Sequence, residues 1–323
     1  MRRVYLDQNK WIELARAAAG KDGAALDDLL LLARHGVAAG LLSLPLSCFH
    51  YMETWRKQAW SQRGTLARFM AELSRFDTIA PADLLLRMEL DLALRERFGQ
   101  PRHIRAVDIF GRGVAHAFGR LGPRFPVSDE LRALLAQHPD LRPSLEEEWE
   151  LAALAGPPED LPVPRLRTGT ERVHGKRFAA GQRENGERLR EAGFGRGRLP
   201  RALIAQELVA ILDPLSEAMG RAGLSADQLA GADTLTDFLL ALPTRRMNYQ
   251  LVRVRHRNPQ QRWEENDLND IAALSVVVPY CDIVVTERHW RGLIRDAHLD
   301  EAYGTIVLDD LRDLAPAILS LPR

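Results

Sequence analysis

Hydrophobic positions follow two patterns along the chain, and these patterns predict where strands and helices lie. Short apolar runs typical of buried strands occupy residues 3–6, 41–44, 283–286 and 305–308. Between them, apolar residues recur at helical spacing over 11–15, 24–39, 47–55, 266–278 and 290–297. Strands that alternate with helices through short connections are typical of a parallel α/β sheet.

The middle of the chain has a different pattern. Residues 61–244 show helical periodicity, for example over 65–76, 82–98, 131–138 and 203–219, and no strand pattern. Neither end alone has enough strands to bury its apolar residues. We therefore expect an α/β fold with an open parallel sheet flanked by helices. Residues 1–60 plus 245–323 would form it, and 61–244 would be a large central helical insertion.

Charge is balanced over the whole chain but not along it. Lys and Arg together number 44, as do Asp and Glu, which excludes a histone-like polycation. Residues 128–160 contain nine acidic and two basic residues, whereas residues 165–201 contain eleven basic and four acidic ones. Because the second stretch is rich in glycine and lacks a steady apolar period, it is expected to be a flexible basic segment.

Cysteine content and hydropathy argue against a disulfide-stabilised protein, a cysteine-built zinc protein and a membrane-spanning protein. Cys48 and Cys281 are too few for a disulfide scaffold or a cysteine-built zinc site. The longest apolar run, residues 271–285, is too short to span a bilayer and contains Asp282. The first residues place a charge where a signal peptide needs an apolar stretch. We expect a cytoplasmic protein with no membrane partner.

Four acidic residues are expected to lie at the same edge of the predicted sheet. Asp7 and Glu287 each follow a strand, Glu53 lies on the helix after the second strand, and Asp270 lies in the first turn of its helix, three residues after Asp267. The carboxyl ends of parallel strands line one crevice. Carboxylates that converge there would repel one another unless a divalent cation neutralised them, and oxygen ligands favour Mg²⁺ or Mn²⁺. Such a cation can activate water against a phosphodiester. The alternative is that each acid is a helix cap or a surface charge.

The stretches around these acids are 4–12 (VYLDQNKWI), 47–53 (SCFHYME), 266–274 (NDLNDIAAL) and 282–287 (DIVVTE). In this order they resemble the PIN and PIN-like nuclease domains. The resemblance implies a metal-dependent nuclease, usually acting on RNA. Thr286-Glu287 departs from the family's Thr-x-Asp. Asp282 is a rival, but it precedes its strand and should lie at the opposite edge of the sheet.

Carrying the family pattern over assigns roles to individual residues. Asp7, Asp270 and Glu287 would bind the metal, with Asp267 replacing or supplementing Asp270, and Glu53 would bind metal or orient the attacking water. Asn9 and Asn266 would hold carboxylates in place by hydrogen bonds. The implied activity is a Mg²⁺- or Mn²⁺-dependent endoribonuclease of toxin, defence or RNA-processing type, with a protein inhibitor or a second copy as a possible partner. A DNA nuclease and a non-catalytic RNA-binding scaffold remain alternatives.

Arginines gather just before the 266–270 motif. Residues 245–263 contain six arginines and no acid, and their spacing fits either a strand or a helix. Five of them are expected to contact nucleic-acid phosphates: Arg245, Arg246, Arg253, Arg255 and Arg257. The alternative is a solvated helix face. The basic stretch 165–201 would clamp single-stranded RNA, or serve as a plain linker.

Overall fold

The protein is described by a computed structural model covering residues 1–21, 23–56, 59–99, 108–120, 128–156, 168–191, 198–229, 231–257 and 262–321. The strands are β1 (Arg2–Leu6), β2 (Leu42–Ser43), β3 (Asp77–Ile79), β4 (Phe110–Arg112), β5 (Ile283–Val285) and β6 (Ile306–Leu308). The first eight helices are α1 (Gln8–Ala18), α2 (Asp27–Ala38), α3 (Cys48–Trp55), α4 (Trp60–Ser74), α5 (Ala82–Phe98), α6 (Gly113–Ala117), α7 (Asp129–Gln137) and α8 (Leu141–Ala155). The others are α9 (Thr168–Glu191), α10 (Arg198–Ala222), α11 (Ala232–Leu240), α12 (Pro243–His256), α13 (Asp267–Tyr280), α14 (Arg288–Asp296), α15 (Leu299–Tyr303) and α16 (Leu314–Ser320).

The two ends of the chain form one four-stranded parallel sheet in the order β2-β1-β5-β6. Strand β1 lies beside β5 with Val4 opposite Ile283 and Leu6 opposite Val285. Strand β6 continues the sheet beyond β5. The prediction of a parallel sheet flanked by helices, with strands from both ends, is confirmed. The registers bring the carboxyl ends of β1 and β5 side by side.

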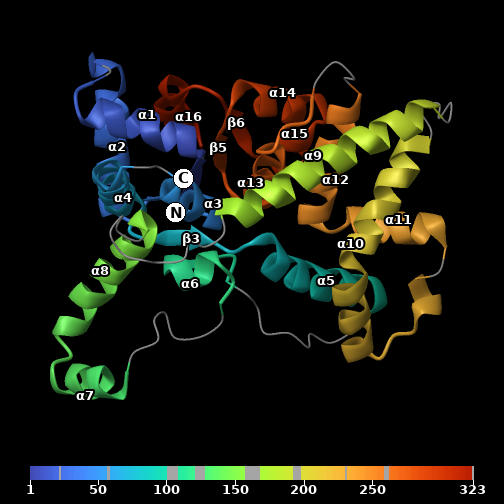
Figure 1. Ribbon diagram of the computed structural model, residues 1–323, viewed down its shortest axis with the longest axis horizontal. Helices are drawn as coiled ribbons and strands as arrows, with labels where there is room; N and C mark the ends of the chain where they lie inside the picture. The colour runs from blue at the N-terminus through green and yellow to red at the C-terminus, as the bar shows by residue number, and fades with distance from the viewer. Residues whose placement is uncertain are drawn as a thin grey trace.

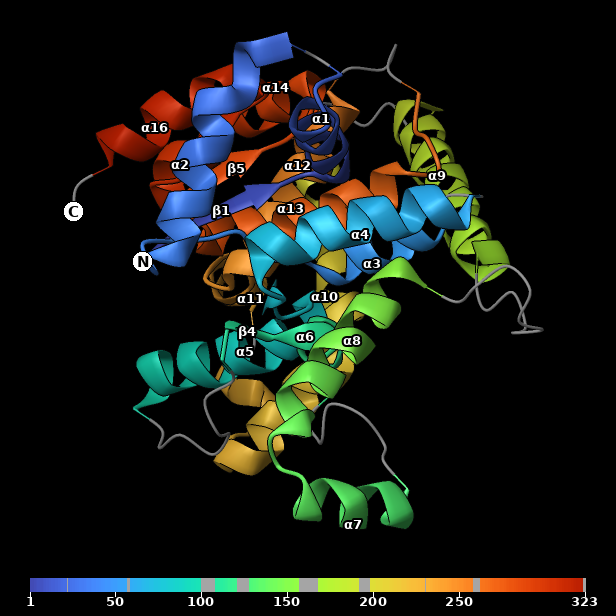
Figure 2. The same ribbon diagram turned by 90° about the vertical axis from the view of Figure 1, so that its left-hand side faces the viewer.

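Each face of the sheet contributes to a separate hydrophobic core. Val4 and Leu6 belong to a core with Trp11 of α1 and Met70 of α4. Tyr5, which points to the opposite face, belongs to a second core that includes residues of α5, α10, α12 and α13. Burying a side chain of this size stabilises the fold by roughly 1.5–3 kcal/mol. Figures 1 and 2 show α1, α2 and α16 on one side of the sheet and α12 and α13 on the other.

The middle of the chain packs into both cores. Helix α4 contributes to the first core, and α5 and α10 contribute to the second. Helix α7 and the adjacent end of α8 extend away from the rest of the molecule (Figures 1 and 2). Among the described residues, no helix has the length and apolar character needed to cross a membrane.

Two expectations for the middle of the chain are wrong. Strands β3 and β4 form an antiparallel pair, with Thr78 opposite Gly111, in a region expected to be helical. Each has three residues, too few to show an alternating pattern. The basic segment expected to be flexible contains the long helix α9. Residues 165–167 and 192–197 of this basic segment lie outside the described residues, so the expectation of flexibility is not tested there.

The uncertain segment before the 266–270 motif is a helix. Helix α12 begins with Pro243 at its first turn and buries Met247, Leu251 and Val254, which are spaced for one helical face. Of the two readings left open, the helical one therefore holds.

Candidate active site

Asp7 lies at the point where the two central strands end. Its backbone N–H donates to Val285 O (2.9 Å), so the chain stays tied to β5 beyond β1. Its side chain caps α1 by accepting from the N–H of Gln8 (2.7 Å), and Thr286 donates its hydroxyl to the other carboxylate oxygen (3.4 Å). Burial raises the pKa of Asp7; the Gln8 N–H opposes this rise and the charge of Glu287 adds to it. Asp7 is therefore a fixed carboxylate that is costly to ionise.

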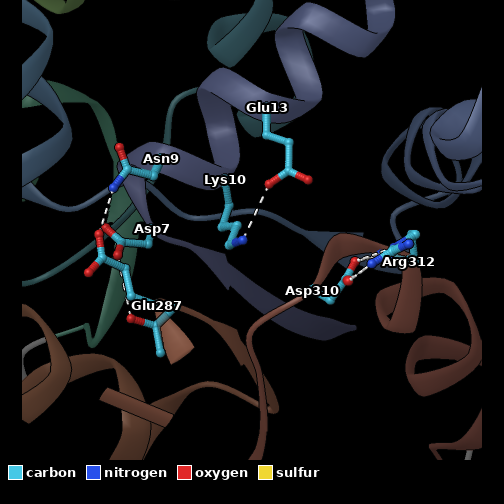
Figure 3. Close-up of polar contacts among 8 residues, drawn as sticks. Asp7, Asn9, Lys10, Glu13, Glu287, Asp310 and Arg312 are labelled. Carbon is cyan, nitrogen blue, oxygen red and sulfur yellow. Dashed lines mark hydrogen bonds and ion pairs between the residues drawn. The ribbon is translucent and has the colours of Figure 1, made fainter. Parts of the chain in front are cut away.

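Glu287 is held against Asp7 from the other strand. It is the residue before α14, and Asn9 on α1 donates its side-chain N–H to Glu287 Oε1 (2.8 Å). Figure 3 shows Asp7 and Glu287 side by side, with Asn9 above them. This is the kind of contact that the sequence analysis assigns to Asn9. Asn266, the residue before α13, does not share this contact and lines another part of the cleft that is described below.

Glu53 reaches the same edge because His50 ties its helix to the end of β1. Ser47 N–H donates to His50 Nδ1 (2.9 Å), so the other ring nitrogen carries the proton and donates to Leu6 O (2.8 Å). Burial lowers the pKa of His50 to about 4, which keeps it neutral. His50 lies within the 47–53 stretch, but the sequence gives no sign of this role, because the bond depends on β1 and α3 lying together.

Asp270 completes the group from the first turn of α13. Trp290 of α14 donates its indole N–H to Asp270 Oδ2 (3.1 Å). The pKa of Asp270 is raised to about 8, mainly by burial and then by the charges of Asp7 and Glu53, with a smaller contribution from Glu287. The four predicted carboxylates therefore share one electrostatic environment.

Asp267 has a different role in the structure. The guanidinium of Arg255 and the backbone N–H of Glu264 both donate to its Oδ2. Arg255 is buried, with its guanidinium 4.8 Å from the ring centre of Trp263 and 5.3 Å from that of Trp290. Asp267 therefore already neutralises a buried cation, whereas the carboxylate of Asp270 is bound by the uncharged indole of Trp290.

The other arginines expected to contact phosphate lie away from these carboxylates. Arg245 pairs with Glu207 (3.8 Å), Arg246 lies over the ring of Tyr303, and Arg253 donates to Gln250 (3.0 Å). Arg257 is exposed at the end of α12. None of these four lines the cleft described next. Arg56 and Arg262, which the sequence analysis did not single out, do line it.

The carboxylates open into one cleft of about 710 Å³. Its walls contain Asp7, Glu53, Asp267, Asp270, Glu287, Asn9, Asn266, Arg56, Arg255 and Arg262. A larger cleft of about 820 Å³ between α4 and α8 is lined by exposed charges of both signs, including Arg68 and Glu147, and by none of the expected site residues. Asp282 lies at the other edge of the sheet, where it accepts from Arg3 N–H (2.7 Å), as expected.

The donor set fits a hard divalent cation in its chemistry. All the converging side chains offer carboxylate oxygens, and Asp270 is strained by the neighbouring negative charges that a cation would offset. Across the described part of the chain, no three His, Cys, Asp or Glu side chains stand close enough together to hold a metal ion. The carboxylates would thus have to turn toward the ion to form a complete coordination shell.

Comparison of the chain with protein-family models, with curated proteins and with solved structures finds no match.

Proposed function

We propose that the protein is a PIN-like, Mg²⁺- or Mn²⁺-dependent nuclease that hydrolyses phosphodiester bonds in RNA. The observation that carries the proposal is the set of four carboxylates, Asp7, Glu53, Asp270 and Glu287, on the walls of one cleft at the carboxyl edge of a parallel sheet. This is where open α/β sheets bind their ligands. The resemblance of the surrounding motifs to the PIN-like family supports the same reading.

The roles follow from how each side chain is held. Asp7, Glu53 and Asp270 are half-buried, whereas Glu287 is exposed and is oriented by Asn9. Asp7 and Asp270 come from the ends of two neighbouring elements and Glu287 faces Asp7 from the next strand. These three would hold the cation. When bound, the cation would lower the pKa of a coordinated water and stabilise charge on the phosphodiester. Glu53 would orient the water.

The cleft also suits a polyanionic substrate. Arg56 and Arg262 lie on the same walls as the carboxylates, so they can bind the phosphates that flank the cleavage point. A polymer places several phosphates along such a cleft, which a small phosphoester does not. We assign RNA rather than DNA from the family resemblance.

The test is cleavage by purified protein and by the Asp7→Asn variant. Wild-type protein should cut single-stranded RNA in Mn²⁺ or Mg²⁺ and lose activity in EDTA. Asp7→Asn removes one charge with little change of shape and should lower the rate at least about 100-fold, because it removes a proposed metal ligand. Glu13→Gln is the matched control: it removes one carboxylate charge from the same helix, α1, where Glu13 pairs with Lys10 (3.3 Å) away from the cleft (Figure 3).

Three results would contradict the proposal. Equal cleavage rates for Asp7→Asn and wild type would show that the reaction takes place elsewhere. Cleavage that persists in EDTA would show that it needs no divalent cation. Cleavage of DNA but not of RNA would leave a nuclease but replace the proposed substrate.

A further inference from the structure

The side chain of Gln8 is buried beside the carboxylates with one end unpaired. Gln8 is the first residue of α1 and is 5% exposed. Its amide nitrogen donates to the hydroxyl of Thr54 (3.1 Å), a fully buried residue of α3. Its carbonyl oxygen, Oε1, has less than 1 Å² of accessible surface and no hydrogen-bond partner among the residues that the structure describes. A buried carbonyl without a partner costs about 1–3 kcal/mol, so something should compensate for it.

The unpaired oxygen belongs to the space that the carboxylates share. Gln8 lines the cleft and also a small cavity of about 10 Å³ that shares part of its lining. Asp7, Glu53 and Asp270 line both spaces as well. A volume of this size holds about one water-sized particle. Because Thr54 holds the nitrogen end of the amide, the oxygen is the end left for an occupant of this space.

We propose that Gln8 Oε1 is an additional ligand of the divalent cation, beside Asp7 and Asp270. An amide carbonyl is a hard oxygen donor of the kind that Mg²⁺ and Mn²⁺ accept. It carries no charge, so it adds a ligand without adding to the repulsion among the carboxylates. Thr54 fixes the direction of the amide. This inference rests on the proposed function because it assumes a cation in the cleft.

The experiment measures Mn²⁺ affinity directly, from the electron paramagnetic resonance signal of free Mn²⁺ during titration of the metal-free protein. Gln8→Met keeps the length of the side chain and removes the hard oxygen. It should weaken Mn²⁺ binding about 10- to 100-fold, the loss typical for removal of a group that supports a metal site. The metal-free variant should melt close to wild type, because removal of an unpaired buried carbonyl offsets the loss of the hydrogen bond to Thr54. Gln8→Leu makes the same test if Gln8→Met folds poorly.

Gln8→Glu is the matched control because it keeps an oxygen at the same place. It should bind Mn²⁺ at least as tightly as wild type. Equal affinity of Gln8→Met and wild type would overturn the inference, as would an equal loss in Gln8→Glu and Gln8→Met, since the oxygen would then not matter. Asp7→Asn, titrated alongside, separates the two proposals: if it loses affinity and Gln8→Met does not, the metal site stands and only the role of Gln8 falls. If wild type binds no Mn²⁺, both fall.

Discussion

The carboxyl group of Asp270 is costly to ionise when no cation is bound. Burial and the charges of Asp7 and Glu53 raise its pKa to about 8, from an ordinary value near 3.8. A carboxyl whose pKa is higher in the folded than in the unfolded state stabilises the fold when protonated, and that stability is lost as the pH rises through the folded pKa. The negative charge gathered in the cleft therefore lowers the stability of the fold when no cation is bound.

Asp270→Asn should consequently raise the melting temperature of the metal-free protein. The variant removes a carboxyl group whose ionisation lowers the stability of the folded protein. This loss begins above about pH 4 and is greatest above pH 8. We expect little difference from wild type at pH 5 and several degrees of added stability at pH 9. Thermal melts in EDTA across this pH range would measure the effect. A difference that does not change with pH would show that the charges are not coupled.

The placement of the four acids could be predicted at the level of single residues, whereas their supporting contacts could not. Asp7 and Glu287 follow strands, and the end of a parallel strand fixes its edge of the sheet whatever the tertiary details. His50 and Arg255 depend on partners far along the chain: Leu6 for the first, Trp263 and Trp290 for the second. No local pattern reveals that a histidine is neutral or that an arginine in a basic run is buried.

At the scale of elements, α9 lies against the loop that leads into α13. Arg183 donates to Trp263 O (3.3 Å), and Gln182 contacts His256 (2.7 Å). Gly175 lies so close to this loop that a β-carbon there would be 2.4 Å from Glu265 O. The helix packs through Gly175, Ala179 and Phe178, whose ring lies 5.6 Å from that of Trp263. These contacts are too few to give an apolar stripe, so the sequence pattern predicts a flexible segment instead.

Gly175→Ala should therefore destabilise the protein, although alanine favours helices. The added methyl group would collide with backbone, which cannot turn aside as a side chain can, and we expect a loss of about 1–3 kcal/mol. Gly181→Ala on the same helix is the control: nothing lies within 4 Å of its new β-carbon, and it should gain about 0.5–1 kcal/mol. Urea denaturation gives both values. Equal effects of the two substitutions would mean that α9 is not docked on this loop.

At the scale of the whole molecule, positive charge is widely distributed but reaches the cleft at few points. Of the residues that line it, Arg56 and Arg262 come from opposite halves of the sequence and Arg255 is occupied by Asp267. The net charge of the protein is zero. Affinity for nucleic acid should thus depend on these local cations and not on the field of the whole protein.

Replacing Arg56 and Arg262 with glutamine should weaken the binding of single-stranded RNA. Binding is best measured by fluorescence anisotropy in the Asp7→Asn background, where cleavage does not interfere. Loss of two phosphate contacts should reduce the slope of log K against log salt by about 1.4. Arg253→Gln with Arg257→Gln removes the same charge outside the cleft and should leave the slope unchanged. The opposite pattern would move the RNA to α12.

The pairing of β1 with β5 also has a consequence for synthesis on the ribosome. Arg3 and Asp282, which are hydrogen-bonded where these strands begin, are 279 residues apart. At about 5–20 residues per second, the strand made first waits roughly 15–55 s for its central neighbour to be translated. Meanwhile an apolar strand with an open edge is exposed to other nascent chains. Recovery of folded protein should therefore depend on chaperones that shield this strand until β5 has been translated.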